Sequence, residues 1–238
     1  MKLTHSFWEE FEATGHLSIA NDFIDPELTK SLGLQIQELF KNPDKLYYHQ
    51  KVKDLRQHFY VDSTHPHDER FKKLYDECST FTLEILEQYF NYLKIDPQAI
   101  QAIFKNHKSF LRPNYYSGHP VGTILSDSHV DTSLVTLLFG GSHDGLEVYN
   151  KSQDKYVQVP TSHKNIIITF GSIMEAWTNG RIKATYHRVI SRQTDPRTSF
   201  PFFFHPSPDA KMNDKYSTFD SYYIFKAKEA MLGGEGNY

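Results

Sequence analysis

The stretch HVDTSLVTLLF (residues 129–139) is the most informative part of the chain, because it joins a candidate metal-binding triplet to a run with the composition of a β-strand. Similar short apolar runs follow it, separated by turn-forming residues such as Gly140-Gly141-Ser142 and Asn179-Gly180. The runs span residues 134–139, 146–149, 156–159, 166–170, 187–190 and 199–204. Many short strands without helices between them predict a mostly β protein, built as a sandwich or jelly roll.

The chain before residue 108 has a helical pattern instead. Asp25-Pro26 is typical of the N-cap and first position of a helix, and Pro43 is expected to stop that helix. Further helices are predicted over residues 68–93, after Asp96-Pro97, and over the tail 218–232, which should end at Gly233-Gly234. We therefore predict a single domain, residues 1–238, made of an N-terminal helical region (1–107), a β core (108–206) and a C-terminal helical tail (207–238).

The composition is that of an ordinary folded protein, with 39% hydrophobic and 23% charged residues among 238. A formal net charge of −3 provides no basic surface, so we expect no nucleic-acid partner. We also expect no membrane partner, because the longest apolar runs are too short to span a bilayer and no signal peptide is visible. The single cysteine, Cys78, has no partner for an internal disulfide, which favours a cytoplasmic location. Oligomeric state is left open.

His129, Asp131 and His187 form a candidate metal-ligand set. Two imidazoles and one carboxylate occupy one face of a metal and leave the other face open, as in non-haem Fe(II) enzymes. With 13 histidines, about one H-x-D triplet is expected by chance, and a single buried histidine is more often structural. The same ligand set can also hold zinc in a hydrolase. The hypothesis therefore depends on the residues around the triplet.

Three pairs of residues two positions apart support the metal hypothesis, because alternate side chains of a strand point to the same face. The pairs are His129 with Asp131, Arg197 with Ser199, and Asn114 with Tyr116. Arg197 and Ser199 together offer the donors of a carboxylate clamp. The same alternation puts Phe203 on their face, as a candidate substrate-binding residue. Further candidates for the cavity mouth are Trp177, Arg112, Arg181 and His119.

These motifs closely resemble a known family. Residues 111–206 are similar to the isopenicillin N synthase-like and plant-type 2-oxoglutarate/Fe(II) dioxygenases. The resemblance is carried, in chain order, by Arg112-Pro113-Asn114-Tyr115-Tyr116, His129-Val130-Asp131-Thr132, Gly145-Leu146-Glu147-Val148, Thr178-Asn179-Gly180, His187-Arg188-Val189 and Arg197-Thr198-Ser199. In the N-terminal half the likeness is weaker and rests on Gly15-His16-Leu17, Leu39-Phe40 and Lys45.

The resemblance implies a double-stranded β-helix (a jelly-roll, cupin-like fold) with an N-terminal helical region. It implies an oxygenase that uses Fe(II), 2-oxoglutarate and O2 to hydroxylate, desaturate or cyclise a small molecule, releasing succinate and CO2. Fe(II) would be held by His129, Asp131 and His187. The far carboxylate of 2-oxoglutarate would lie on Arg197 and Ser199, assisted by Asn114 and Tyr116.

Two alternatives remain at this stage. Residues 171–174 and 199–203 resemble isopenicillin N synthase more than the plant enzymes. In that oxidase no 2-oxoglutarate is used, and the R-x-S pair binds the substrate carboxylate. Asn114 beside Tyr115-Tyr116 favours the 2-oxoglutarate branch. The second alternative is a non-catalytic jelly-roll binding protein that has kept the site.

Overall fold

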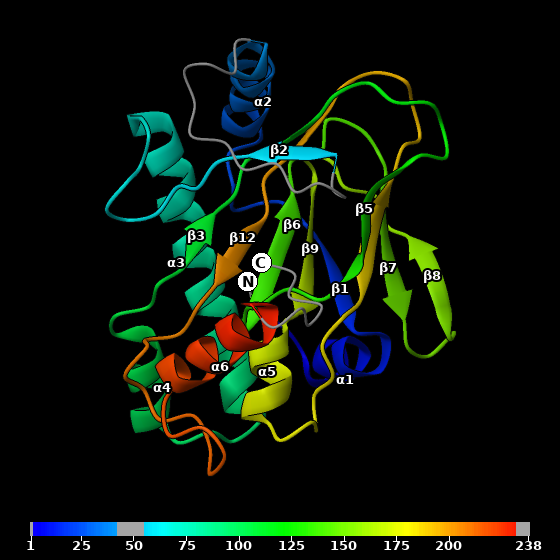
Figure 1. The fold of residues 1–238 in the computed structure, drawn as a ribbon. Coiled ribbons are helices and arrows are strands. Elements are labelled where there is room, and N and C mark those ends of the chain that lie inside the picture. Colours follow the sequence, from blue (N-terminus) through cyan, green and yellow to red (C-terminus); the bar gives the residue numbers. More distant parts are fainter. Residues whose placement is uncertain (1, 42–54, 232–238) are drawn as a thin grey trace.

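A computed structural model describes residues 2–41 and 55–231, and Figure 1 shows their arrangement. The largest sheet is antiparallel and has five strands. In spatial order these are β1 (His16–Ala20), β9 (Asn165–Phe170), β6 (Val135–Phe139), β12 (Phe202–Phe204) and β3 (Phe110–Leu111). β6 and β12 are buried at every position, which explains why their sequences are continuous apolar runs rather than alternating ones.

Two smaller antiparallel sheets complete the β core. One contains β5 (Ile124–His129), β10 (His187–Ile190), β7 (Leu146–Asn150) and β8 (Lys155–Gln158), in that spatial order. The other contains β11 (Arg197–Ser199), β4 (Asn114–Tyr116) and β2 (Arg56–His58), again in spatial order. The strands form a double-stranded β-helix, so the predicted fold class, mostly β with flanking helices, is confirmed.

Most helices pack on the large sheet at the side away from the smaller sheets (Figure 1), whereas α2 (Pro26–Phe40) lies against β4 and β11 of the three-stranded sheet. The longest is α3 (Glu69–Tyr92), which begins where the Asp68 side chain accepts hydrogen bonds from the backbone N–H groups of Arg70 and Phe71. Its buried face reaches the sheet through Tyr75, whose ring lies 5.6 Å from that of Phe202. The other helices are α1 (His5–Thr14), α2 (Pro26–Phe40), α4 (Pro97–Phe104), α5 (Ser172–Trp177) and α6 (Phe219–Met231).

The predicted elements are largely present. The helix begun by Asp25-Pro26 is α2, and the long helix, the Asp96-Pro97 helix and the tail helix are α3, α4 and α6. The predicted stops at Pro43 and Gly233-Gly234, and Lys45 of the weaker resemblance, lie outside the described residues. The predicted run 199–204 is two strands, since β11 ends at Ser199 and β12 starts at Phe202 in another sheet.

The N-terminal region is not purely helical, which corrects the prediction for residues 1–107. β1 pairs with β9 along its whole length, and β2 pairs with β4. Both strands are three to five residues long and contain polar residues, so their apolar pattern is too short to distinguish from a loop. They become strands because the edge of a preformed sheet supplies their hydrogen-bond partners.

One large apolar core joins all three parts of the chain. It includes Trp8 of α1, Phe71 of α3, Phe170 of β9, Phe204 of β12 and Phe219 of α6. This shared core supports the single domain that the sequence predicts. Within the described ranges, no helix is both long and apolar enough to cross a membrane.

Candidate metal centre and pocket

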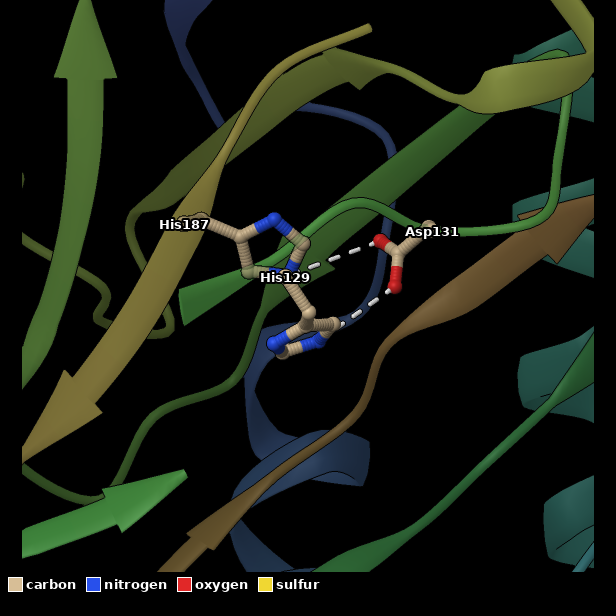
Figure 2. A group of neighbouring side chains, drawn as sticks. All are labelled: His129, Asp131 and His187. Atoms are coloured by element: carbon tan, nitrogen blue, oxygen red, sulfur yellow. Dashed lines mark ion pairs between the residues drawn. The ribbon is translucent and has the colours of Figure 1, made fainter. Parts of the chain in front are cut away.

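Strand pairing brings the two distant histidines of the predicted ligand set together. β10 lies between β5 and β7, and its antiparallel register places His187 directly opposite His129. Opposed residues on neighbouring strands have Cβ atoms about 5 Å apart. The two imidazole rings accordingly lie 4.3 Å apart between centroids (Figure 2).

Asp131 lies just beyond the end of β5, in a loop held by α5. Its backbone oxygen accepts a hydrogen bond of 2.7 Å from the Ser172 N–H. The same loop passes so close to Gly171 that a Cβ there would lie 2.2 Å from the Ser133 carbonyl oxygen. Only glycine fits this approach, so the loop and the first turn of α5 hold the Asp131 carboxylate in place.

The three side chains point toward one another (Figure 2) and are all buried. The Nε2 atoms of His129 and His187 lie 3.7 and 3.6 Å from the two Asp131 carboxylate oxygens, and the candidate ligand atoms all fall within 4.8 Å of one another. In the described part of the chain, no other group of three such residues is found. The structure thus brings the predicted ligand set together.

Hydrogen bonds orient both imidazoles for metal binding. The Nδ1–H of His129 donates to the Asp127 carbonyl oxygen at 2.7 Å, and that of His187 donates to the Thr185 carbonyl oxygen at 3.3 Å. A histidine that donates from Nδ1 in its neutral form carries a free lone pair on Nε2, which is the atom facing Asp131. Burial, reinforced by the neighbouring His187, lowers the pKa of His129 to about 3, so the ring is neutral at physiological pH.

Asp131 remains ionised although burial opposes its charge. His187, His129 and Arg112 outweigh the burial and hold the pKa of the Asp131 carboxyl below its usual value. One of its oxygens, Oδ2, is buried without a hydrogen-bond partner. An unpartnered carboxylate oxygen facing two nitrogen lone pairs is an arrangement of acceptors only, and a divalent cation satisfies all three. The donor set therefore fits a metal such as Fe(II).

A pocket of about 430 Å³, including solvent at its mouth, opens beside the three side chains. Arg197, Ser199, Asn114 and Tyr116 all line it. They converge because β11 pairs with β4 so that Arg197 lies opposite Tyr116 and Ser199 lies opposite Asn114. The two predicted pairs therefore share one face of a sheet.

Hydrogen bonds hold the Arg197 side chain in place on this face. Its Nε donates to the His143 carbonyl oxygen and its Nη2 to the Thr161 hydroxyl, both at 3.2 Å. Its guanidinium carbon lies 5.6 Å from the centre of the Tyr116 ring. Burial lowers the pKa of the guanidinium, but from so high a value that the group stays charged. Since guanidinium has five N–H donors, others remain for a carboxylate.

The structure places one of the two predicted substrate residues in the pocket and the other outside it. Phe203 lines the pocket, and so does Arg112, one of the candidates for its mouth. Trp177 does not line it: its ring packs 5.1 Å from that of Phe90 and 6.3 Å from that of Phe219, among the helices. Helix α5 turns this side chain toward the large core. Arg181 and His119 are also absent from the pocket lining.

Arg56 and Thr161 were not identified from the sequence, although both line the pocket. Arg56 reaches it because β2 pairs with β4, opposite Tyr116. Thr161 matters because it braces Arg197. Neither residue belongs to a local motif, and the pairing of β2 with β4 spans more than fifty residues of sequence, so no signal in the chain marks them.

Comparison with known proteins gives a consistent result. Residues 107–206 match the family model of the 2OG-Fe(II) oxygenase superfamily. The 2-oxoglutarate-dependent dioxygenase traH from Penicillium crustosum is 34% identical over 87 residues, covering 36% of this chain and 27% of the relative. The chain spans between 27% and 54% of the length of three curated relatives that it matches.

Two solved structures share the fold over nearly the whole chain. A candidate oxygenase from Shewanella oneidensis has a TM-score of 0.79 and 26% identity, over 96% of this chain and 94% of that one. A candidate 2OG-Fe(II) oxygenase family protein from Caulobacter crescentus has a TM-score of 0.71 and 19% identity, over 94% of this chain and 92% of that one. At 19% identity the second likeness shows the fold alone.

Proposed function

Because the chain belongs to the 2OG-Fe(II) oxygenase superfamily, we propose that it oxidises a small molecule with O2, using Fe(II) and 2-oxoglutarate. The observation that carries the proposal is the combination of two sites in one pocket. One site is the group of three candidate metal ligands, and the other is Arg197, which is held by hydrogen bonds on a neighbouring sheet. Either site alone would suit several classes of protein, whereas together they match the needs of a metal and a dicarboxylate.

The metal would be held by His129, Asp131 and His187. Their neutral nitrogens and hard oxygen suit Fe(II), and three ligands leave positions open for a co-substrate and O2. Bound iron would supply the O2 activation that couples oxidative decarboxylation of 2-oxoglutarate, to succinate and CO2, to oxidation of the substrate.

The far carboxylate of 2-oxoglutarate would be bound by Arg197 and Ser199. The guanidinium offers parallel N–H donors, and the Ser199 hydroxyl adds another. Asn114 and Tyr116 are their cross-strand neighbours and would assist on the same face. The protein's part in the reaction would be to hold these groups in fixed positions and to keep bulk water out of a buried site.

The substrate would be a small molecule, since the site lies in a pocket lined by buried side chains. Hydroxylation, desaturation and cyclisation are all compatible with the site. Cys78, a buried free thiol, supports a location in a reducing compartment such as the cytoplasm.

An anaerobic titration tests the proposal. Metal-free protein is loaded with Fe(II) and then with 2-oxoglutarate while visible absorption is recorded. A weak charge-transfer band that needs both additions is expected. Arg197→Gln should weaken 2-oxoglutarate binding about 30-fold or more, because it removes one charge of a buried pair, whereas exposed Arg181→Gln should leave binding unchanged.

Two other outcomes would change the conclusion. If Fe(II) binds but 2-oxoglutarate produces no band, Arg197 and Ser199 are not a co-substrate site, and an oxidase that needs only O2 becomes the favoured enzyme class. If Fe(II) does not bind, the enzyme proposal fails, and a zinc site or a binding protein without catalysis takes its place.

A further inference from the structure

Arg112 is a buried charge that the proposed function does not use. It lines the pocket, is 5% exposed, and its Nε has no hydrogen-bond partner. Across the described ranges, its guanidinium forms no ion pair and donates no hydrogen bond to another residue. Leaving a buried charge without partners costs several kcal/mol, so such a group usually has a ligand. Arg197, by comparison, is braced by two hydrogen bonds.

Two aromatic neighbours hold Arg112 in place, and the charge of Asp131 offsets part of its own without forming an ion pair with it. Its guanidinium carbon lies 4.5 Å from the centre of the Phe203 ring, and the Phe110 ring stacks on Phe203 with centroids 4.9 Å apart. Phe203 therefore supports Arg112. A guanidinium that rests on an aromatic ring keeps its N–H donors available to a ligand.

The charges around the pocket also favour an anion. Among the described lining residues there are three arginines, Arg56, Arg112 and Arg197, and a single carboxylate, Asp131. Fe(II) carries two positive charges and 2-oxoglutarate two negative ones, so their binding adds no net charge that would offset Arg112. Burial, followed by the proximity of Arg56, lowers the pKa of Arg112 to about 10, so the guanidinium is still charged at neutral pH.

We propose that Arg112 binds a carboxylate of the substrate, at a pole of the pocket separate from the co-substrate clamp of Arg197, so that the enzyme acts on small organic acids. This inference rests on the proposed function and specifies its substrate class. Arg112 is the specificity-determining contact, Phe203 is its positioning residue, and Arg56 adds positive charge beside it.

The test measures binding in the protein loaded anaerobically with Fe(II) and 2-oxoglutarate. The probes are matched pairs of acid and primary amide: benzoate and benzamide, phenylacetate and phenylacetamide, 4-phenylbutyrate and 4-phenylbutyramide. Equilibrium dialysis gives each affinity.

At least one acid should bind about tenfold or more tightly than its amide, and Arg112→Met should abolish that preference. Arg112→Lys should restore part of it, because lysine keeps the charge but loses the planar donor edge. Phosphate monoesters of the same size distinguish carboxylate from general anion binding.

Two measurements separate this inference from a structural role for Arg112. Unfolding temperature should change little in Arg112→Met, because Arg112 has no hydrogen bond or ion pair to lose, whereas the loss of a structural ion pair would lower it clearly. The charge-transfer band should form as in wild type. Arg181→Met, an exposed change, is the matched control.

The inference is overturned if no acid is preferred over its amide, if phosphate monoesters bind better than acids, or if Arg112→Met keeps the preference. It is also overturned if Arg112→Met loses 2-oxoglutarate, because Arg112 would then be the co-substrate clamp. Failure of the band in wild type would instead reject the proposed function itself.

Discussion

Asp131 provides the only carboxylate among the described residues that line the pocket, and one of its oxygens lacks a partner. The residue therefore has a role in each of the two states of the site. Without metal its charge is favoured by His187, His129 and Arg112, which hold the pKa of the carboxyl below its usual value, and with metal it is the anionic ligand. A neutral side chain of the same shape separates these effects.

Asp131→Asn should weaken Fe(II) binding by more than the roughly 10- to 100-fold that loss of an outer-shell partner costs. The metal-free variant should be less stable than wild type, because the neighbours that hold the Asp131 pKa below its usual value favour the charged side chain over a neutral one. Dialysis against Fe(II) and chemical unfolding measure the two effects. Asp127→Asn is the matched control, since this exposed residue of β5, four positions before Asp131, contributes its carbonyl oxygen but not its side chain to the site. Equal loss in both variants would contradict the assignment.

His205, which is not one of the candidate metal ligands, gives a further pH dependence, because burial outweighs the charge of Asp131 on it. Its ring is stacked on that of Tyr223 at 5.2 Å, and burial lowers its pKa to about 4. The folded state therefore keeps the ring neutral, while the unfolded chain takes up a proton near pH 6.5. The contribution to stability is present above about pH 6.5 and is lost as the pH falls toward 4, by about 3 kcal/mol.

His205→Phe should consequently flatten the decline in the free energy of unfolding between pH 6.5 and 4, measured by urea titration at several pH values. The difference between wild type and variant cancels contributions from His129, which is present in both. Exposed His65→Gln should leave the decline as in wild type. An unchanged slope in His205→Phe would show that the ring is protonated in the folded protein.

At the scale of elements, the turn before β7 determines how closely the backbone approaches the co-substrate clamp. Gly145 has φ +155°, and a Cβ there would lie 2.8 Å from the Ile190 carbonyl oxygen and 3.4 Å from Nε of Arg197. A side chain at this position must displace the end of β10 and would then lie in contact with Arg197.

Gly145→Ala should reduce 2-oxoglutarate affinity about tenfold and lower the free energy of unfolding by about 1–3 kcal/mol, because the added methyl group overpacks a rigid region. Titration of the charge-transfer band and chemical unfolding measure these. Gly122→Ala is the comparison: Gly122 also has positive φ, at +90°, but no atom lies within 4 Å of its Cβ position. Gly122→Ala should lose some stability because of backbone strain, and its affinity for 2-oxoglutarate should be unchanged. Equal affinity losses would mean that strain, not contact with Arg197, is responsible.

The sequence predicts those elements that are determined by neighbouring residues, and it does not predict those that depend on distant partner strands. Asp25-Pro26 and the long stripe of α3 depend on neighbouring residues and are readable from the sequence. Side-chain alternation through residues 197–203 also holds: Arg197, Ser199, Pro201 and Phe203 all line the pocket, although the chain changes sheets between β11 and β12.

Other features cannot be predicted from the sequence. The structure of β1 and β2 depends on partner strands far along the chain, so the sequence does not place Arg56 in the pocket. Trp177 lies outside the pocket lining, because it belongs to α5, a helix without a clear sequence signal, whose rotation decides the direction of the side chain.

At the scale of the whole molecule, the two tryptophans are distant reporters of the metal site. Trp8 and Trp177 pack in the large core with the helices, and neither lines the pocket. Because one core joins the helices to the sheets, a ligand bound in the pocket should stabilise the entire protein.

Metal and 2-oxoglutarate at about 100 times their dissociation constants should each raise the free energy of unfolding by about 2.7 kcal/mol, as seen by tryptophan fluorescence. Circular dichroism should give the same transition. Redox-inert Zn(II) can replace Fe(II) in this experiment. Asp131→Asn should lose the metal-dependent part. A shift in circular dichroism without one in fluorescence would show that the helical side and the pocket unfold separately.

The interior position of β12 has a consequence for synthesis of the chain. β12 fills the gap between β6 and β3, yet its residues 202–204 come later in the chain than both of these strands. Until they leave the ribosome, β6 and β3 have exposed edges with unpaired backbone groups, and nascent chains with such edges readily associate. The large sheet therefore cannot be completed before β12 has been synthesised, and a chain terminated before residue 202 should accumulate as aggregate rather than as a smaller folded unit.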